Sequence, residues 1–183
     1  MYAQLNTKTV FSFMDATVKL TDYITAAKTL GYQTLGISDV DNLHAAHQFI
    51  TQAKAAGIQP VIGYETTLLL DGLAINFTFI AKTNAGLQNL YSISSKKNFG
   101  YNNFSDIHSH LGDVALILPA DSAVDSILTH LPQNDVFVGL AQPMAQGFLR
   151  PTIPFLSVRY LNAGDAETLA ILHHVKNGTK YDD

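Results

Sequence analysis

Apolar residues in the first part of the chain alternate between helical spacing and short continuous runs. Between residues 20 and 30 they recur every three or four positions, which predicts a helix with Thr21 as its cap and Gly31 as its end. The run at residues 33–37 predicts a buried strand, and a second helical pattern extends from residue 41 to Gly57. The chain thus begins as an alternation of strands and helices.

Two further strands and one tight turn complete this region. Residues 2–5 predict a short first strand, and residues 61–65 predict a third one. The apolar runs at 68–70 and 73–81 are separated by an Asp-Gly dipeptide, which is typical of a two-residue hairpin turn. The sequence therefore predicts one β-hairpin.

The remainder of the chain continues the alternation less regularly. A helix is expected from Asn84, with Leu87, Leu90 and Tyr91 facing inward. The other expected elements are strands at 114–118, 136–140 and 155–158, a helix at 122–131, and a final helix at 165–176 that ends at Gly178. The stretch from 141 to 154 contains three prolines and is the least regular.

Repeated strand–helix units with one hairpin indicate an α/β protein whose sheet or barrel is mostly parallel. The 183 residues are enough for one domain with a sizeable core, so we expect a single domain over residues 1–183. In folds of this kind, functional side chains gather in the loops that follow the carboxyl ends of the strands.

Composition excludes several classes of protein. The chain has no cysteine, which excludes disulfides, thiolate catalysis and zinc sites built on cysteine. No apolar run reaches the ~20 residues that span a bilayer, and the first residues lack the basic and apolar regions of a signal peptide. We therefore expect a soluble cytoplasmic protein with no membrane partner.

The charge pattern does not indicate a nucleic-acid surface. The net charge is -4, and the eleven Lys and Arg residues are scattered, with Lys96 and Lys97 as the only adjacent pair. Proteins that bind phosphate backbones usually concentrate positive charge on one face. Contact with DNA is therefore expected only through something attached to this domain. The sequence also lacks glycine-rich nucleotide loops and the serine-hydrolase motif.

Three carboxylates fall where predicted strands end. Asp39 follows the second strand, Glu65 ends the third, and Asp15 lies in the loop after the first. Three acids at one rim could hold a divalent metal ion, since such ions take oxygen ligands readily. In the alternative reading, Asp39 and Asp41 cap the next helix and Glu65 faces solvent. The spacing alone leaves both readings open.

The histidines are weak candidates for metal ligands. His108 and His110 have the H-x-H spacing of many metal sites, but they precede a predicted strand instead of following one. The other five lie on a predicted helix, in a turn or near a helix end: His44, His47, His130, His173 and His174. We expect all seven to be structural or solvated.

Three stretches resemble the motifs of PHP domains, the polymerase and histidinol phosphatase family. Residues 5–15 read LNTKTVFSFMD, where the family has L-H-x-H-T-x-x-S-x-x-D. Residues 35–42 read LGISDVDN, similar to L-A-[IL]-T-D-H-G-N, and residues 55–65 read AAGIQPVIGYE, similar to A-G-I-K-P-I-[IV]-G-x-E. The third stretch, together with residues 77–82 and 86–90, resembles the PHP domain of the bacterial DNA polymerase III alpha subunit in particular.

The resemblance resumes at residues 156–160, which read LSVRY where the family has N-D-V-H-Y, and it continues to residue 183. It covers most of the chain and is weak between residues 99 and 155. It implies a PHP-type distorted (βα) barrel, with mostly parallel strands and the hairpin as an insertion. It also implies that the chain is an amino-terminal fragment of a much longer polymerase.

The chain departs from the family where the family binds metal. Six ligand positions carry other residues: Asn6, Lys8, Val40, Asn76 and Arg159 in place of histidine, and Ser157 in place of aspartate. Asp15, Asp39 and Glu65 are retained, and Asp121 lies near a further ligand position. A site of several metal ions needs imidazoles and carboxylates around the cations. The resemblance therefore implies a vestigial site, with no catalytic residues and no metal.

The resemblance implies an inactive structural and docking module within a DNA-directed DNA polymerase, a nucleotidyltransferase of DNA replication. Its expected partners are the remainder of the alpha chain and, docked on its surface, a proofreading exonuclease or other replisome subunits. DNA is contacted through the parent enzyme, and magnesium is expected only in the polymerase palm. The alternatives are an active metal-dependent PHP phosphoesterase, either a proofreading nuclease or a histidinol-phosphatase-like enzyme, and a free-standing binding module.

Two of the departures suggest what replaced the metal ions. By the resemblance, Lys8 and Arg159 stand at former histidine positions on the first and last strands and are expected to face the same rim as the three carboxylates. Like charges gathered there repel one another unless cations compensate them. We hypothesise that the two side chains substitute for the metal ions and tie the ends of the sheet together. Lys97 is expected to be exposed and to serve as their control.

Overall fold

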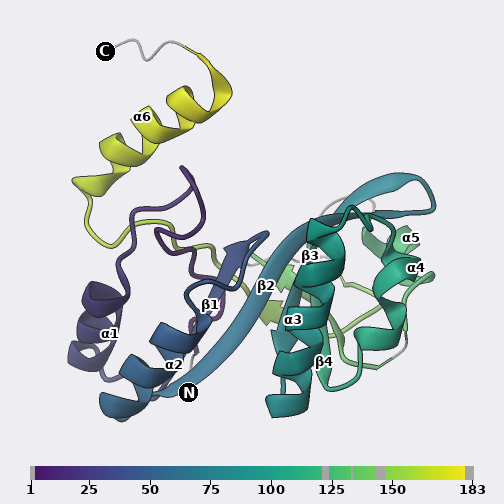
Figure 1. Ribbon diagram of the computed structural model, residues 1–183, viewed down its shortest axis with the longest axis horizontal. Coiled ribbons are helices and arrows are strands. Elements are labelled where there is room, and N and C mark those ends of the chain that lie inside the picture. Colours follow the sequence, from purple (N-terminus) through teal and green to yellow (C-terminus); the bar gives the residue numbers. More distant parts are fainter. Residues whose placement is uncertain (1–2, 121–123, 133, 143–146, 180–183) are drawn as a thin grey trace. The chain divides into compact units, whose positions relative to one another are not determined.

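The computed structural model of the protein describes residues 3–120, 124–132, 134–142 and 147–179 (Figure 1). The chain divides into two compact units, residues 1–61 with 157–183, and residues 62–156. The two ends of the chain therefore belong to the same unit. That the whole chain acts as one domain stays a prediction.

The first unit contains the helices predicted from the sequence, although the second begins at Ala46 instead of near residue 41. Its regular elements, in the described residues, are α1 (Leu20–Thr29), β1 (Thr34–Val40), α2 (Ala46–Ala55) and α6 (Asp165–Asn177). α1 has Lys19 as its N-cap residue, with extended backbone and no side-chain cap, so the predicted cap at Thr21 is wrong. The chain turns helical two residues earlier than expected, which places Thr21 inside the first turn. Gly178 ends α6 in the left-handed conformation, as predicted.

The segment of residues 4–8 lies alongside β1 and approaches it closely at Gly36. The Gly36 N–H donates to the Gln4 carbonyl at 2.7 Å, and a Cβ at Gly36 would lie 2.9 Å from the backbone of this segment. Tyr23 of α1 closes over the same place: its hydroxyl donates to the Gly36 carbonyl at 3.0 Å, and its ring stacks on Phe49 of α2. The core of the first unit therefore holds the start of the chain in place.

The same segment also pairs with the later part of the chain. A parallel bridge joins Thr7 to Val158, and a second parallel bridge joins Gln4 to β1. The Lys8 N–H donates to the Val158 carbonyl at 2.9 Å, and the Val158 N–H donates to the Asn6 carbonyl at 2.9 Å. The strand predicted at residues 2–5 is thus reduced to bridges, and Tyr2 lies outside the described residues.

The second unit is built on a mixed sheet. Its strands are β2 (Gln59–Leu70), which begins in the first unit, β3 (Leu73–Ala81), β4 (Val114–Pro119), β5 (Val136–Leu140) and β6 (Thr152–Pro154). The sheet order is β1-β2-β3-β4-β5-β6, with antiparallel pairing of β2 to β3 and β3 to β4 and parallel pairing from β4 to β6. Asp71 and Gly72 join β2 to β3 with positive φ angles of 50° and 82°, so the predicted hairpin is confirmed.

The last strand does not lie at residues 155–158, where the sequence predicts it. The strand lies at Thr152–Pro154, whereas the range 155–158 contributes only the bridge at Val158. The Pro151 carbonyl accepts from the Val138 N–H at 2.9 Å, so a proline takes part as an acceptor. Proline is tolerated in an edge strand, because a residue whose N–H would face away from the sheet loses no hydrogen bond between strands.

Helices accompany this sheet, and they confirm most of the pattern. α3 (Asn84–Asn98) begins after Thr83, whose hydroxyl accepts from the Gly86 N–H at 3.2 Å. Leu90 and Ile93 are fully buried, but Tyr91 is 37% exposed, so the prediction that it faces inward is wrong. The short helices are α4 (Phe104–Ile107), the 3₁₀ helix η1 (His108–His110) and α5 (Val124–Leu128). The predicted start of α5 at residue 122 lies outside the described residues.

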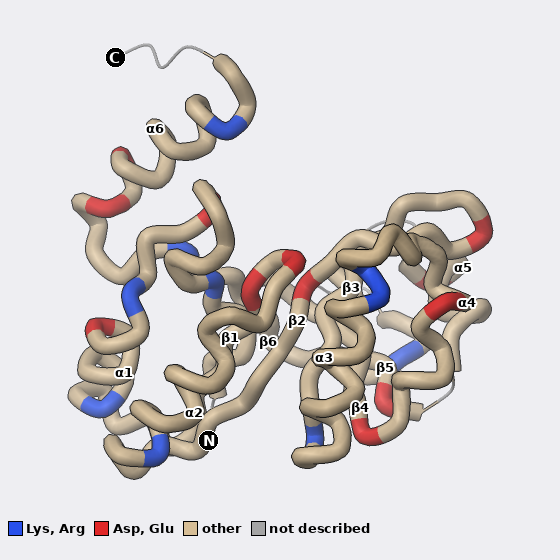
Figure 2. Tube along the Cα trace, in the orientation of Figure 1, with Lys and Arg blue, Asp and Glu red and all other residues tan. Residues whose placement is uncertain are grey.

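The α/β class is therefore confirmed, with parallel pairing predominant outside the hairpin and the β3–β4 pair. In the part of the chain that the structure describes, no helix is long and apolar enough to cross a membrane. Lys and Arg residues occur in both units and are interspersed with Asp and Glu along the trace (Figure 2).

The packing of α3 gives a first testable prediction. A Cβ at Gly86 would lie 2.1 Å from the Asp113 carbonyl oxygen, a backbone atom at the entrance to β4. Overpacking of this kind costs about 1–3 kcal/mol, and each kcal/mol lowers the Tm by roughly 2–4 °C in a chain of this size. We expect the Gly86→Ala variant to melt roughly 2–12 °C below the wild type in circular dichroism.

Gly112→Ala is the matched control, since its Cβ would lie 3.7 Å from Asn89 Nδ2, an ordinary contact distance. This control should melt near the wild type. Equal melting temperatures for the Gly86 and Gly112 variants would contradict the close approach of α3 to the start of β4.

Candidate functional site

The ammonium group of Lys8 lies at the centre of the candidate site in the first unit. Lys8 is fully buried, at 0% exposure. Its Nζ donates to Asn6 Oδ1 at 2.7 Å, to the Ser38 carbonyl at 2.5 Å and to Ser38 Oγ at 3.1 Å. The Ser38 hydroxyl also donates to Asn6 Oδ1 at 3.0 Å. A buried charge is tolerated only when such contacts replace its water shell. Two of the predicted site residues, Asn6 and Lys8, therefore act together.

Asp39 anchors the loop that follows this segment, residues 9–17, which we name the aromatic loop because it contains two phenylalanines. The Asp39 side chain accepts from the Thr9 N–H at 2.6 Å, from Thr9 Oγ1 at 2.7 Å and from Ser12 Oγ at 2.6 Å. Asp39 is 2% exposed, so these bonds satisfy a buried carboxylate. The Ser12 hydroxyl in turn accepts from the Val40 N–H at 3.1 Å.

These contacts overturn the capping alternative for Asp39. α2 begins at Ala46, and its N-cap residue Ala45 makes no side-chain cap bond. Asp39 and Asp41 both lie several residues before this helix, and Asp41 has a positive φ of 56°. The carboxylate of Asp39 stabilises a loop and caps no helix.

Asp15 joins the aromatic loop to α6. Its carboxylate forms an ion pair with the Arg159 guanidinium, whose Nη1 also donates to the Asp15 carbonyl at 3.2 Å. The other carboxylate oxygen lies 3.3 Å from His173 Nε2 and 3.9 Å from Lys176 Nζ. The Asp15 side chain is only 15% exposed, so these basic groups provide most of its charge compensation.

Two other predicted positions, Val40 and Ser157, do not contribute a side chain to the hydrogen bonds described for the candidate site. Val40 takes part through its N–H and through its carbonyl, which accepts from Asn42 Nδ2 at 2.9 Å. Ser157 is exposed, and its neighbour Val158 makes the pairing with segment 4–8. The aliphatic side chain of Val40 has no donor atom for a metal ion, and Ser157 offers only a hydroxyl.

Glu65 and Asn76 belong to the second unit and form a pair within it. Asn76 Nδ2 donates to Glu65 Oε1 at 3.2 Å, and Thr78 Oγ1 donates to Glu65 Oε2 at 3.4 Å. These three residues lie on the paired strands β2 and β3, where Glu65 stands directly opposite Thr78. The convergence of Glu65 with Asp15 and Asp39 stays a prediction. Asp121 lies outside the described residues.

The histidines are distributed over both units. His108 and His110 form η1 ahead of β4, and His130 Nδ1 lies 2.9 Å from Asp71 in an exposed pair. His47 lies in α2, whereas His44 precedes this helix. Within the described residues, no three His, Asp or Glu side chains lie together as a metal ion would need.

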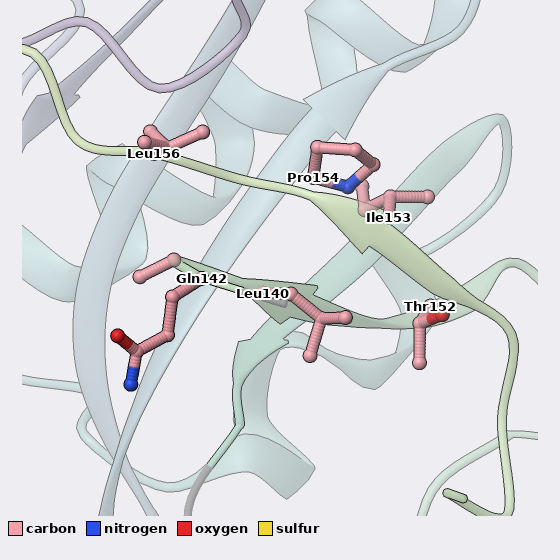
Figure 3. A pocket seen from close by; sticks show the side chains of 7 residues that line it. Leu140, Gln142, Thr152, Ile153, Pro154 and Leu156 are labelled. Atoms are coloured by element: carbon pink, nitrogen blue, oxygen red, sulfur yellow. The ribbon is translucent and has the colours of Figure 1, made fainter. Parts of the chain in front are cut away.

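An apolar pocket of about 440 Å³ in the second unit is the other concave feature of interest (Figure 3). It lies beside β5 and β6 and is lined by Leu140, Ala141, Gln142, Thr152, Ile153, Pro154 and Leu156. Gln142 and Thr152 are the polar members of this set, and none of the seven carries a titratable group. Among the described residues that line the pocket there is no acid or base, so the Thr152 hydroxyl has no partner in this set that could activate it as a nucleophile.

Thr9, Ser12 and Ser38 are functional contacts that the sequence reading missed. All three are buried hydroxyl residues next to predicted site positions. Two of them lie in the first motif-like stretch, and their closeness to Asp39 depends on contacts between residues about thirty positions apart. A buried hydroxyl must find a hydrogen-bond partner, but the sequence does not say which one.

Comparison with known proteins agrees with the motifs. The PHP domain family matches residues 4–140. The chain is 36% identical over 180 residues to the DNA polymerase III subunit alpha of Streptococcus pyogenes serotype M1, covering 97% of this chain and 17% of that protein. It is 32% identical over 194 residues to the subunit of the same name from Staphylococcus epidermidis strain ATCC 12228, covering 100% of this chain and 17% of the relative. The matched part is the amino-terminal region of these subunits.

Likeness to solved structures is more distant. The chain is similar to an amidohydrolase from Chromobacterium violaceum with a TM-score of 0.48 and 9% identity, over 94% of this chain and 97% of the other. A likeness at this level carries no argument about function. The chain spans only 17% of the length of the curated relatives it matches, so their activities belong to far more protein than is present here.

The contacts of Lys8 yield the second prediction. Lys8→Met keeps most of the volume of the side chain and removes the ammonium donor, which leaves the oxygen atoms of Asn6 and Ser38 without it in a buried site. Because the variant also avoids the cost of burying a charge, we take the net loss as that of about one hydrogen bond to a charged group, about 1.5–3 kcal/mol. Each kcal/mol corresponds to roughly 2–4 °C. We expect the Tm to fall by roughly 3–12 °C, measured by circular dichroism.

Lys28→Met is the matched control, because Lys28 is an exposed lysine in the last turn of α1. Lys97, which the sequence suggested for this purpose, is unsuitable because its Nζ donates to the Thr67 carbonyl and to Asn102 Oδ1. If Lys8→Met melts with the control at the wild-type temperature, the buried ammonium does not stabilise the fold.

Proposed function

We propose a function on the basis of family membership, since the chain belongs to the PHP domain family. It acts as a catalytically inactive structural and docking module at the amino-terminal end of a bacterial DNA polymerase III alpha subunit. The identity to such subunits over nearly the whole chain supports the placement. The hydrogen bonds and ion pairs at the positions where the family binds metal support the proposal that the domain is catalytically inactive.

The observation that carries this proposal is the burial of Lys8. By the motif resemblance, the family has a metal-binding histidine where this chain has a lysine. The Lys8 ammonium is surrounded by oxygen atoms of Asn6 and Ser38 and has no exposure to solvent. A metal ion placed near it would meet a positive charge in a low-dielectric interior, where like charges repel strongly. At this position the lysine itself provides the positive charge, and on this proposal no metal ion binds there.

Two other positions support the same reading. Arg159, also at a family histidine position, forms an ion pair with the retained Asp15. The retained Asp39 accepts three hydrogen bonds from Thr9 and Ser12. A metal ion would have to compete with these donors for the carboxylate oxygens. The first unit therefore uses two of its retained carboxylates to hold the loop and α6.

On this proposal, polymerisation belongs to the remainder of the alpha chain. The parent enzyme is a DNA-directed DNA polymerase, a nucleotidyltransferase of DNA replication, and its magnesium and its DNA contacts lie outside this domain. The remainder of that chain is the first partner of the domain, and a proofreading exonuclease or other replisome subunits are candidates for its outer surface. The domain works in the cytoplasm with the rest of the polymerase.

The alternative function is an active metal-dependent phosphoesterase. It requires imidazoles and carboxylates that hold several metal ions and activate water. Asp15, Asp39 and Glu65 are the only retained members of the family's set at the positions compared, and the first two are engaged as described. The geometry of the first unit therefore does not favour this alternative.

The third prediction concerns metal content. We expect the purified protein, dialysed against excess zinc or manganese and then against metal-free buffer, to retain less than one ion per chain by elemental analysis. The reason is that Lys8 and Arg159 occupy ligand positions with positive charge. Two or three retained ions per chain would overturn the inactive assignment.

A fourth prediction addresses activity directly. We expect no manganese-dependent degradation of single-stranded DNA, because the described carboxylates in the first unit have no free cluster with which to activate water. Glu65→Gln serves as the control, since it removes a retained family carboxylate while keeping the size of the side chain. Nuclease activity in the wild type that disappears in Glu65→Gln would establish the phosphoesterase alternative, whereas activity equal in both proteins marks a contaminant.

A further inference from the structure

The aromatic loop is fixed in place although it has no regular secondary structure. Asp39 binds Thr9 and Ser12 at its start, and Asn42 Nδ2 donates to the Phe11 carbonyl at 2.9 Å. Further along, the ion pair between Asp15 and Arg159 holds the loop to the later part of the chain. A loop held at several points loses little conformational entropy when a partner binds to it.

This rigid loop presents apolar side chains to solvent. Phe13 is 75% exposed, Val10 is 45% exposed and Phe11 is 38% exposed. An exposed aromatic side chain on a fixed backbone is costly in water and is the kind of residue that dominates protein interfaces. Because most of its surface lies in water, Phe13 contributes little to the core of the first unit.

Positive charge lies beside the apolar group. Two residues after Phe13, the single carboxylate of Asp15 faces the Arg159 guanidinium, the Lys176 ammonium and the His173 imidazole. The basic side chains are 30–45% exposed, so part of each remains available to a partner. Among these four side chains, two permanent cations face one carboxylate, although the chain as a whole carries -4.

We propose that the aromatic loop, with Arg159 and Lys176 beside it, is a docking surface for an acidic segment of a protein partner. Phe13 packs against apolar residues of that segment, and acidic side chains next to those residues face the two cations. The positive charge of Arg159 and Lys176 selects a partner segment of negative charge, and the exposed ring of Phe13 provides the apolar contact that anchors it. This inference rests on the proposed function, because it assigns the docking role to particular residues.

The test selects peptides from a phage-displayed random library on the immobilised wild-type protein. The selected peptides are then synthesised with a fluorophore and titrated by anisotropy. We expect them to combine acidic with apolar residues, and we expect Phe13→Ala to weaken their binding by about tenfold or more. Lys176→Gln should weaken binding by a few-fold, and added salt should weaken wild-type binding in the same direction.

Matched controls separate the surface from general stickiness. Phe99→Ala removes an aromatic residue that is 84% exposed in the other unit, and Lys28→Gln removes a lysine in the last turn of α1. Both controls should bind the selected peptides as the wild type does. Thermal melts of all four variants check that each one is folded, and Phe13→Ala is expected to melt normally because its ring is exposed.

Several outcomes would overturn the proposal. These are the recovery of no peptide, the recovery of peptides without acidic residues, and binding that is equal in wild type and Phe13→Ala. Binding of a single-stranded oligonucleotide that is lost in Phe13→Ala would also overturn it, because the ring would then serve as a base-stacking platform. These results leave the metal-content and nuclease measurements untouched, so failure here is distinguishable from failure of the proposed function.

Discussion

The buried ammonium of Lys8 imposes the constraint on which the first unit depends. An ammonium without water must be surrounded by oxygen acceptors, and here they come from Asn6 two residues away and from Ser38 on β1. The contacts fix the register between the start of the chain and β1, because a shift of one residue would move the ammonium away from the Ser38 carbonyl. Gly36 allows the close approach that this register needs.

The position of the next loop follows from that register. Once segment 4–8 is aligned with β1, the residues immediately after Lys8 lie next to the residue after Ser38. Asp39 then meets the Thr9 N–H and the two hydroxyls, and each of these groups satisfies another that is also buried. Two buried charged residues, Lys8 and Asp39, thus organise a segment that has no helix or strand of its own.

The sequence predicted most helices and strands because their apolar positions recur with the period of a helix or lie in short runs. It failed where the outcome depends on contacts across the fold. Tyr91 has the spacing of an inward residue, but Ile93 takes the buried position, and β6 lies among prolines where a pattern of apolar residues shows little. At the site, the motifs identified Lys8, Asp15 and Asp39. The motifs also included Asn6 and Arg159, which contact Lys8 and Asp15. Hydroxyl partners such as Ser38 were not predictable, because they are recognised only when β1 lies beside the start of the chain.

A covalently attached cation differs from a bound metal ion in one thermodynamic respect. The stability that a metal contributes depends on the concentration of free metal, through mass action, and on the protonation of its ligands. The Lys8 side chain is covalently part of the chain and cannot leave the site, so the stabilisation that it gives to segment 4–8 does not depend on the concentration of free metal. On the proposed function this difference matters, because a docking surface must keep its shape whatever the composition of the solution. The aromatic loop is held through Asp39 to the same frame. On the proposals made above, Phe13 is therefore presented by a scaffold that charged side chains of the chain itself stabilise.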